Sequence, residues 1–188
     1  MIILASSSPR RKELLKQIFE DFTIIKPSFD ESLISKDDKE LAKKEAYFKG
    51  LSVLNDGINH NDDLIISCDT IVKLNQKVYG KPSNLDEAQQ FLKELSGNTH
   101  QVISGYALFY KGKVINKESI SYVTFNNLTD EDISFYIKNE YVLDKAGAYA
   151  IQDDDKFHLI NKIKGSLNNI IGLPIEDIKS DLDVLFRE

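Results

Sequence analysis

The 188-residue sequence has one cysteine, Cys68, and no apolar run that approaches the length of a membrane span. One cysteine excludes an intramolecular disulfide framework and any cysteine-rich zinc site. The apolar run at residues 1–5 is too short for a signal peptide, so we expect a cytoplasmic protein without a membrane anchor.

Several signatures of catalysis and nucleotide binding are also missing. The sequence has no Walker motif, no dinucleotide fingerprint and no serine in a nucleophile elbow. Basic residues are outnumbered, with 24 Lys and Arg against 30 Asp and Glu and a net charge of −6. A general nucleic-acid binder needs a broad basic surface, so this balance favours a small anionic ligand in a local basic pocket instead.

The most informative segment that is present follows residues 1–5, which are typical of a buried strand. Ser8 precedes a proline and is predicted to cap a helix. Arg10, Arg11 and Lys12 then fill the first helical turn, where the positive helix end normally favours acidic residues. We interpret this turn as an anion site, with phosphate as the commonest ligand; a solvated basic turn is the alternative.

Strand and helix patterns alternate along the chain. Apolar and β-branched runs predict strands at 22–25, 64–74, 102–110, 113–125 and 157–160. Helical periodicity predicts helices at about 9–20, 38–54, 84–95, 129–138 and 174–186. A Lys-Gly turn at 111–112 predicts a hairpin. The fold class is therefore α/β with a mixed, partly antiparallel sheet flanked by helices, and residues 1–188 are expected to form a single domain.

Asp69 is the strongest candidate for chemistry because it interrupts the apolar run at 64–72. A carboxylate in a core strand costs several kcal/mol unless it is paired, bound to metal or open to a cleft. We therefore predict a catalytic or metal-binding role for Asp69. A salt-bridged carboxylate at a strand end is the alternative.

Two other reactive residue types are predicted to be structural. Cys68 alternates to the face of the strand opposite Asp69 and is expected in the core. His100 has no cysteine or second histidine nearby in the sequence, so a hydrogen-bonded structural histidine is favoured over a zinc ligand.

Four further segments carry weaker signals. Lys81 precedes a proline, which restricts its geometry, although a loop lysine is usually solvated. Asp30 and Glu31 could hold a hard cation, although adjacent loop acids are also usually solvated. Gly147 between two alanines permits close approach of another backbone or a flat ligand. Gln152 could pair with the amide-like edge of a base.

Together these segments resemble the Maf family of nucleoside triphosphate pyrophosphatases over nearly the whole chain. The matching motifs lie at 8–15, 30–31, 69–72, 80–82, 96–100, 144–149, 151–152 and 172–174. The resemblance implies an elongated α/β fold with a central cleft, similar to the inosine triphosphate pyrophosphatases. The Ala-Gly-Ala-Tyr and Ile-Gln motifs resemble the subgroup that acts on dTTP and UTP.

The resemblance implies hydrolysis of the α–β phosphoanhydride of dTTP and UTP, and of modified pyrimidine nucleotides, to a monophosphate and pyrophosphate. It implies a house-cleaning enzyme that needs a divalent metal, Mg²⁺ or Mn²⁺. The expected binding partner of the protein is the nucleoside triphosphate, and neither nucleic acid nor a membrane is expected as a partner. The protein could also form a homodimer. The alternative is a non-catalytic, nucleotide-sensing regulator of cell division; the presence of Asp69 and Lys81 beside the basic helix favours catalysis.

The same resemblance implies roles for individual residues. Asp69 would be the general base or orient the water. The triphosphate would be bound by Ser8, Arg10, Arg11 and Lys81, and the base would be selected by Arg10, Thr70 and Gln152. Glu31 and Asp69 would hold the metal.

One departure from the family pattern lies in the helix near residue 45. Glu45 stands where the resemblance places a phosphate-facing lysine. Either Lys44 or Lys49 substitutes for that lysine, or the phosphate contact is lost. A carboxylate at this position could repel phosphate or recruit metal.

Overall fold

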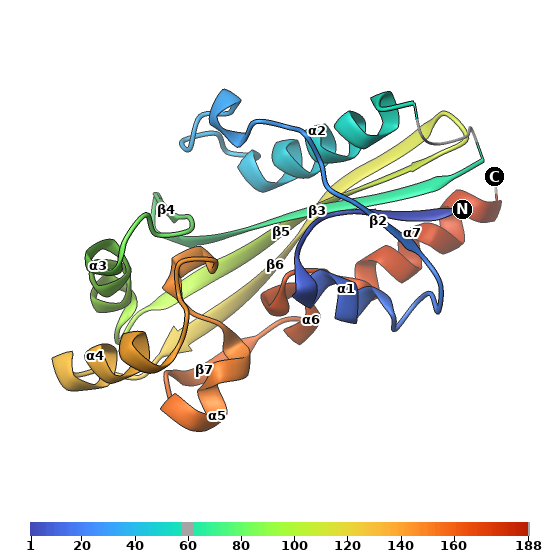
Figure 1. Cartoon of the computed structure of the whole chain (residues 1–188). Helices are drawn as coiled ribbons and strands as arrows, with labels where there is room; N and C mark the ends of the chain where they lie inside the picture. Colours follow the sequence, from blue (N-terminus) through green and yellow to red (C-terminus); the bar gives the residue numbers. More distant parts are fainter. Residues whose placement is uncertain (58–61, 188) are drawn as a thin grey trace. The chain divides into compact units, whose positions relative to one another are not determined.

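A computed structural model describes residues 1–57 and 62–187 (Figure 1). In these residues the strands form a seven-stranded mixed sheet in the order β2-β1-β3-β5-β6-β7, with β4 paired to β3. The strands are β1 (Ile2–Ala5), β2 (Thr23–Ile25), β3 (Leu64–Leu74), β4 (Lys77–Tyr79), β5 (Thr99–Tyr110), β6 (Lys113–Phe125) and β7 (Ile160–Lys164). β1 is parallel to β2 and β3, whereas the β3–β4 and β6–β7 pairs are antiparallel. The predicted α/β class with a partly antiparallel sheet is confirmed.

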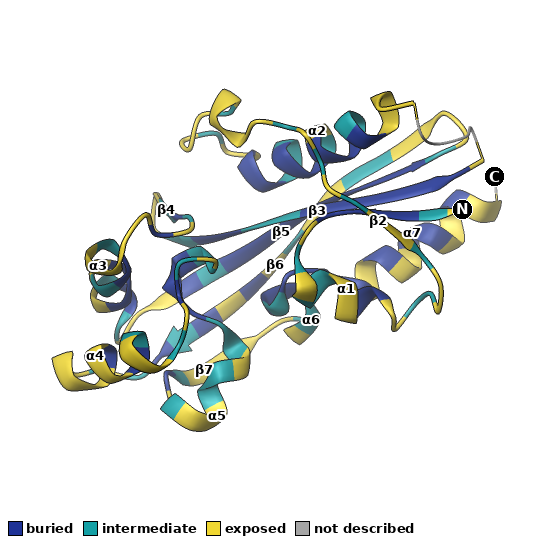
Figure 2. Cartoon of the chain, in the orientation of Figure 1, coloured by how far each residue is buried: buried dark blue, intermediate teal, exposed yellow. Residues whose placement is uncertain are grey.

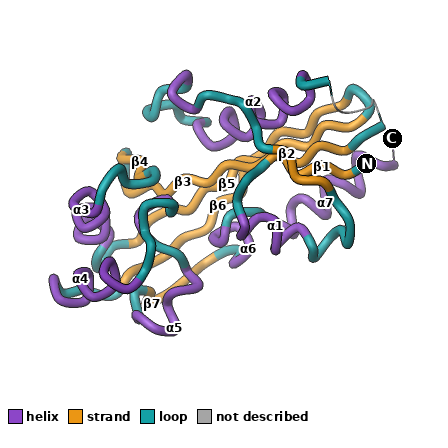
Figure 3. Tube along the Cα trace, in the orientation of Figure 1, coloured by secondary structure: helices purple, strands orange, loops and turns teal. Residues whose placement is uncertain are grey.

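The helices of the described residues are shown in purple in Figure 3. They are α1 (Pro9–Leu15), α2 (Leu41–Asn55), α3 (Leu85–Leu95), α4 (Asp130–Asn139), α5 (Asp154–Phe157), α6 (Leu167–Ile171) and α7 (Ile175–Arg187), with short 3₁₀ turns η1 (Glu31–Leu33), η2 (Ala146–Ala148) and η3 (Ile151–Asp153). None of them combines the length and the apolar character that crossing a membrane would require.

The chain divides into two compact units. The first unit consists of Met1–Thr70, Ser104–Ser119 and Asn168–Glu188, and the second consists of Ile71–Ile103 and Ile120–Leu167. The single domain over residues 1–188 stays a prediction.

In the first unit, helices cover both faces of the strands, and their buried sides face the sheet (Figure 2). One apolar cluster joins α1 and α7 to one face of β1, β3 and β5; it includes Leu4, Leu14, Leu15, Ile66, Cys68, Leu108, Leu173, Ile178 and Leu182. A second cluster lies under α2 on the opposite face and includes Ile3, Ala5, Val53, Ile65, Ala107 and Phe109. The alternation of side chains along each strand produces these two cores.

Helix α2 packs unusually close to the sheet at Gly105. A Cβ atom at this position would lie 2.1 Å from the carbonyl oxygen of Ala42, so only glycine fits. Ser67 of β3 adds a polar link, because its hydroxyl donates to the carbonyl oxygen of Ala46 at 2.6 Å. These contacts anchor α2 directly over the strand that carries Asp69.

The predicted helix start at Ser8 is confirmed. The Ser8 hydroxyl accepts a hydrogen bond from the backbone N–H of Arg11 at 3.4 Å, and Pro9 is the first helical residue. The helix is shorter than predicted: after Leu15 the N–H groups of Gln17 and Ile18 bond to carbonyls three residues back, at 3.0 and 2.9 Å, so the chain continues as turns.

The strand predicted at 157–160 is wrong in position. Residues 154–157 form helix α5, and β7 begins only at Ile160. Two aspartates in the first turn favour the helix. Phe157 packs edge-on against Tyr136 at 4.9 Å, and His158 ends the helix in a left-handed conformation. The short strand β4, which pairs with β3 through Val72 and Tyr79, was not predicted.

Candidate active site

Strand β3 directs Asp69 and Thr70 to opposite faces of the first unit. Asp69 shares its face with Ser67, which contacts α2. Thr70 shares its face with Cys68, and both side chains donate to the Gly172 carbonyl oxygen, at 3.4 and 3.2 Å. Cys68 is fully buried, which confirms that it is a core residue.

Asp69 contacts the ammonium group of Lys49, which α2 holds over the strand. The same ammonium lies 2.6 Å from Oε1 of Glu31, in the 3₁₀ turn η1. Lys44 points elsewhere and pairs with Asp38 at 2.5 Å. Of the two lysines that could replace the missing cation of α2, the structure therefore brings Lys49 to the site.

Glu45 lies one helical turn before Lys49 and is also buried. Its burial, its hydrogen bond to Asp69 and the negative charge of Asp69 raise the pKa of Glu45 to about 9. Glu45 is therefore a neutral carboxyl at pH 7 and donates its proton toward the Asp69 carboxylate.

Asp69 stays ionised beside this neutral carboxyl. Its burial opposes ionisation, but the positive charge of Lys49, the hydrogen bond from Glu45 and the charge of Arg11 together hold the pKa of Asp69 below its usual value. The same pairing acts on the partner: burial opposes the Lys49 charge, yet Asp69 and Glu31 raise the pKa of Lys49. The cluster thus combines two carboxylates, one ammonium and one neutral acid.

Arg11 reaches the other face of β3 from the first turn of α1. Its Nε donates to the Gly172 carbonyl oxygen at 2.8 Å, one Nη donates to the Thr70 hydroxyl at 3.2 Å, and the other donates to the Ser6 hydroxyl at 3.4 Å. Three of its five N–H donors are used within the protein. Arg11 therefore ties the loop after β1 to β3 and to the turn before α7.

Two polar residues that the sequence did not single out as site residues complete this network. The Ser104 hydroxyl is hydrogen bonded to the Thr70 hydroxyl at 2.8 Å and also lies 3.1 Å from the Asn169 carbonyl oxygen, to which it donates. Ser104 and Asn169 are both fully buried. The sequence feature that could have indicated Ser104 is its position as a polar residue within the apolar run of β5.

The second unit carries the other two predicted site residues, Lys81 and Gln152, both exposed. The Gly147 N–H donates to the Gly80 carbonyl oxygen at 3.0 Å and joins the segments that contain them. Gly147 has φ +68, and a Cβ there would lie 3.1 Å from Val72. The close neighbour at this glycine is therefore the Val72 side chain, and neither the predicted backbone approach nor the flat ligand accounts for it.

His100 is a structural residue of the second unit, as predicted. Its Nε2 is hydrogen bonded to the Tyr149 hydroxyl at 2.7 Å, and its ring packs edge-on against Phe125. Burial lowers the pKa of His100 to about 4. A neutral, buried imidazole in an aromatic cluster fits a packing role.

The residues proposed as metal ligands do not form a resident metal site. Carboxylate oxygens suit Mg²⁺ and Mn²⁺, but Glu31 and Asp69 both face the ammonium of Lys49. Within residues 1–57 and 62–187, no group of three or more His, Cys, Asp or Glu side chains is arranged to hold a metal ion. A lysine thus lies between the two expected ligands.

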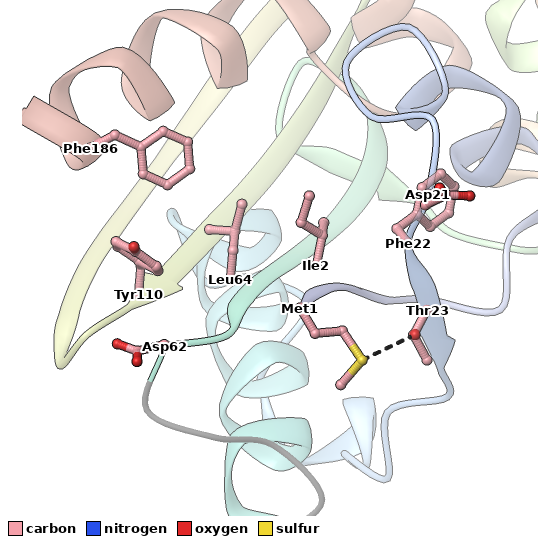
Figure 4. A pocket seen from close by; sticks show the side chains of 9 residues that line it. All are labelled: Met1, Ile2, Asp21, Phe22, Thr23, Asp62, Leu64, Tyr110 and Phe186. Carbon is pink, nitrogen blue, oxygen red and sulfur yellow. Dashed lines mark hydrogen bonds between the residues drawn. The ribbon is translucent and has the colours of Figure 1, made fainter.

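A cavity of about 590 Å³ lies elsewhere in the first unit, near the start of β1 (Figure 4). Aromatic rings of Phe22, Tyr110 and Phe186 line it together with the carboxylates of Asp21 and Asp62. No lysine or arginine is among its lining residues, so it does not suit a triphosphate.

The protein has an α/β fold, an ionised carboxylate beside a buried lysine, and a helix that begins with basic residues. These features are typical of enzymes that act on anionic substrates. Its structure is similar to that of the Staphylococcus aureus Ham1 protein, with a TM-score of 0.54 at 16% identity over 97% of both chains. This similarity confirms the expected inosine triphosphate pyrophosphatase-like fold.

The sequence defines the family more closely. The Maf-like protein family model matches residues 1–185, so this chain belongs to the Maf family. It is 42% identical to the dTTP/UTP pyrophosphatase of Thermosipho africanus over 94% of this chain and 89% of that protein. It is also 42% identical to the dTTP/UTP pyrophosphatase of Pyrococcus furiosus, over 93% of this chain and 90% of the relative.

Proposed function

We propose that this protein is a nucleoside triphosphate pyrophosphatase that hydrolyses dTTP and UTP to the monophosphate and pyrophosphate. The observation that carries the proposal is the Asp69 carboxylate, which Lys49 and Glu45 keep ionised and oriented at the end of an apolar strand segment. Relatives that carry this activity in their names cover nearly the whole chain. We expect it to act in the cytoplasm, and a homodimer stays a prediction.

Asp69 is proposed to orient and activate the attacking water. A carboxylate with a lowered pKa is a weak base, so holding the water in line with the scissile P–O bond is its larger contribution. The water oxygen bonds to the α-phosphorus as the bond from that phosphorus to the bridging oxygen breaks. Pyrophosphate leaves with the bridging oxygen, and the water proton passes to the Asp69 carboxylate. Phosphoryl transfer needs charge neutralisation more than covalent help.

The triphosphate is proposed to bind at the start of α1. Ser8, Arg10 and Arg11 lie there. Arg11 has five N–H donors and uses three of them in the bonds described above, which leaves two for phosphate oxygens. Lys81 is proposed to add a further cation. Selection of the base is assigned to Arg10, Thr70 and Gln152, which rests on the family resemblance.

A requirement for Mg²⁺ or Mn²⁺ is also part of the proposal. Glu31 and Asp69 are the expected ligands, but Lys49 lies between them. The metal is therefore expected to enter as the chelate of the triphosphate, which makes it part of the substrate.

The test is pyrophosphate release from a panel of canonical and modified nucleoside triphosphates with Mg²⁺ or Mn²⁺. We expect release from dTTP and UTP, and an activity loss of about 100-fold or more in Asp69→Asn. Binding of a non-hydrolysable α,β-imido analogue of UTP should change less than about threefold in this variant, since the shape of the side chain is kept.

Exposed Asp86→Asn on α3 serves as the matched control and should keep full activity. Wild-type activity in Asp69→Asn would refute the role of Asp69. Analogue binding without release from any triphosphate would favour the nucleotide-sensing regulator of cell division.

A further inference from the structure

The ammonium of Lys49 lies among three acidic side chains from three separate elements. Asp69 comes from β3, Glu31 from the 3₁₀ turn η1, and Glu45 from the preceding turn of α2. Lys49 contacts the first two directly, and Glu45 is hydrogen bonded to Asp69. One cation thus holds together two segments that are distant in the sequence.

Burial makes this arrangement costly unless the charges match. The Lys49 side chain is 10% exposed and that of Asp69 is 13% exposed. An ammonium removed from water needs carboxylate partners, and the converse holds for the carboxylates. Lys49 is therefore an integral part of the cluster, whereas Lys44 on the same helix is 43% exposed in its pair with Asp38.

The Lys49 ammonium binds the same carboxylate oxygens that a divalent cation would need. Carboxylate oxygens that converge from separate elements are the donors that Mg²⁺ and Mn²⁺ prefer. An ammonium already bound to the same oxygens competes with a free metal ion, both by occupying them and by its positive charge. A metal that arrives with a triphosphate brings further oxygen ligands and negative charge.

We propose that Lys49 is a positioning residue that acts as a built-in cation, holding Glu31 and Asp69 in place and excluding free divalent metal until nucleotide binds. The proposal rests on the proposed function only for the identity of the nucleotide. The exclusion of metal is a property of the nucleotide-free protein and is tested without turnover.

The experiment is a titration of the nucleotide-free protein with Mn²⁺, followed by the electron paramagnetic resonance signal of the free ion. Lys49→Met removes the charge and keeps the length of the side chain, so the carboxylates are expected to bind Mn²⁺ about tenfold or more tightly than in the wild type. Lys49→Arg keeps the charge and should behave like the wild type. Lys44→Met on the same helix is the matched control and should bind Mn²⁺ like the wild type.

Equal Mn²⁺ affinity in Lys49→Met and the wild type would overturn the proposal, as would a gain of the same size in Lys44→Met. Circular dichroism and thermal unfolding establish that Lys49→Met is folded. If it is not, Lys49→Gln is the second neutral variant, since its amide can still donate hydrogen bonds to the carboxylates, and it should also bind Mn²⁺ about tenfold or more tightly than the wild type. Wild-type Mn²⁺ affinity in this variant would overturn the proposal, whatever the pyrophosphatase assay gives.

Discussion

The guanidinium of Arg11 donates from Nε to the carbonyl oxygen of Gly172 at 2.8 Å, across 161 positions of sequence. This bond ties the first turn of α1 to the turn before α7. It gives part of the unusual basic turn a structural explanation. Arg11 thus has a structural role in addition to its predicted contact with phosphate. Arg10 and Ser8 are the other predicted phosphate contacts of this helix start.

Arg11→Lys is expected to lower the free energy of unfolding by about 1–3 kcal/mol, because one ammonium cannot reproduce the fork that reaches Gly172, Thr70 and Ser6. The KM for dTTP should rise in the same variant. Urea unfolding and steady-state kinetics measure the two effects. Lys12→Met, exposed in the same turn, should shift stability by less than about 0.5 kcal/mol. Unchanged unfolding of Arg11→Lys would contradict the structural role.

His100 predicts a loss of stability in acid. Its pKa is lowered from 6.5 to about 4 by burial, so between these pH values the unfolded chain binds more protons than the folded one. The stabilisation is fully present above pH 6.5 and is lost as the pH falls through about 4, by about 3 kcal/mol in total.

The measurement is the urea midpoint as a function of pH across this range. His100→Asn should flatten the acid limb. His158→Asn is the matched control, because His158 is exposed and left-handed (φ 52), a conformation that asparagine tolerates. An acid limb that survives in His100→Asn would show that other groups cause it.

Gly105→Ala should destabilise the first unit by about 3 kcal/mol or more, or prevent folding, because the new Cβ would lie 2.1 Å from the Ala42 carbonyl oxygen. Thermal unfolding by circular dichroism measures the effect. Gly112→Asn at the β5–β6 hairpin provides the contrast: its φ is +76 and no atom lies within 4 Å of the added Cβ, so a loss under about 1 kcal/mol is expected. Similar melting of both variants would argue against the tight α2 contact.

Gln152→Ala is expected to reduce discrimination between dTTP and dATP while leaving the fold unchanged, since Gln152 is exposed in η3. Loss of one base-specific hydrogen-bonding side chain should lower the ratio of kcat/KM values by about tenfold or more. The exposed neighbour Asp155→Asn is the control and should keep the ratio. An unchanged ratio in Gln152→Ala would remove this residue from base selection.

Local patterns predicted most of the helices and strands. The cap at Ser8, the buried Cys68 and the structural His100 were all predicted from immediate sequence context, and all three are confirmed. Short elements were harder to predict from the sequence. Strand β4, which is stabilised by pairing with β3, was missed, and α5 replaces part of a predicted strand. Their apolar periods are too short to distinguish strand from helix without the packing partner.

The amino-acid sequence was enough to identify Asp69 as an unusual carboxylate, because a charge inside an apolar strand is costly wherever that strand lies. The basic helix start and the family motifs could also be recognised there. The choice between Lys44 and Lys49 needed the packing of α2, since both are lysines on the same helix. The close contact at Gly105 of β5 and the hydrogen bond from Ser67 of β3 set α2 against the sheet, with Lys49 facing Asp69 and Lys44 paired with Asp38. The distance and the rotation of a helix relative to the sheet determine which charged side chains come into contact. Both depend on the packing of side chains that are distant in the sequence.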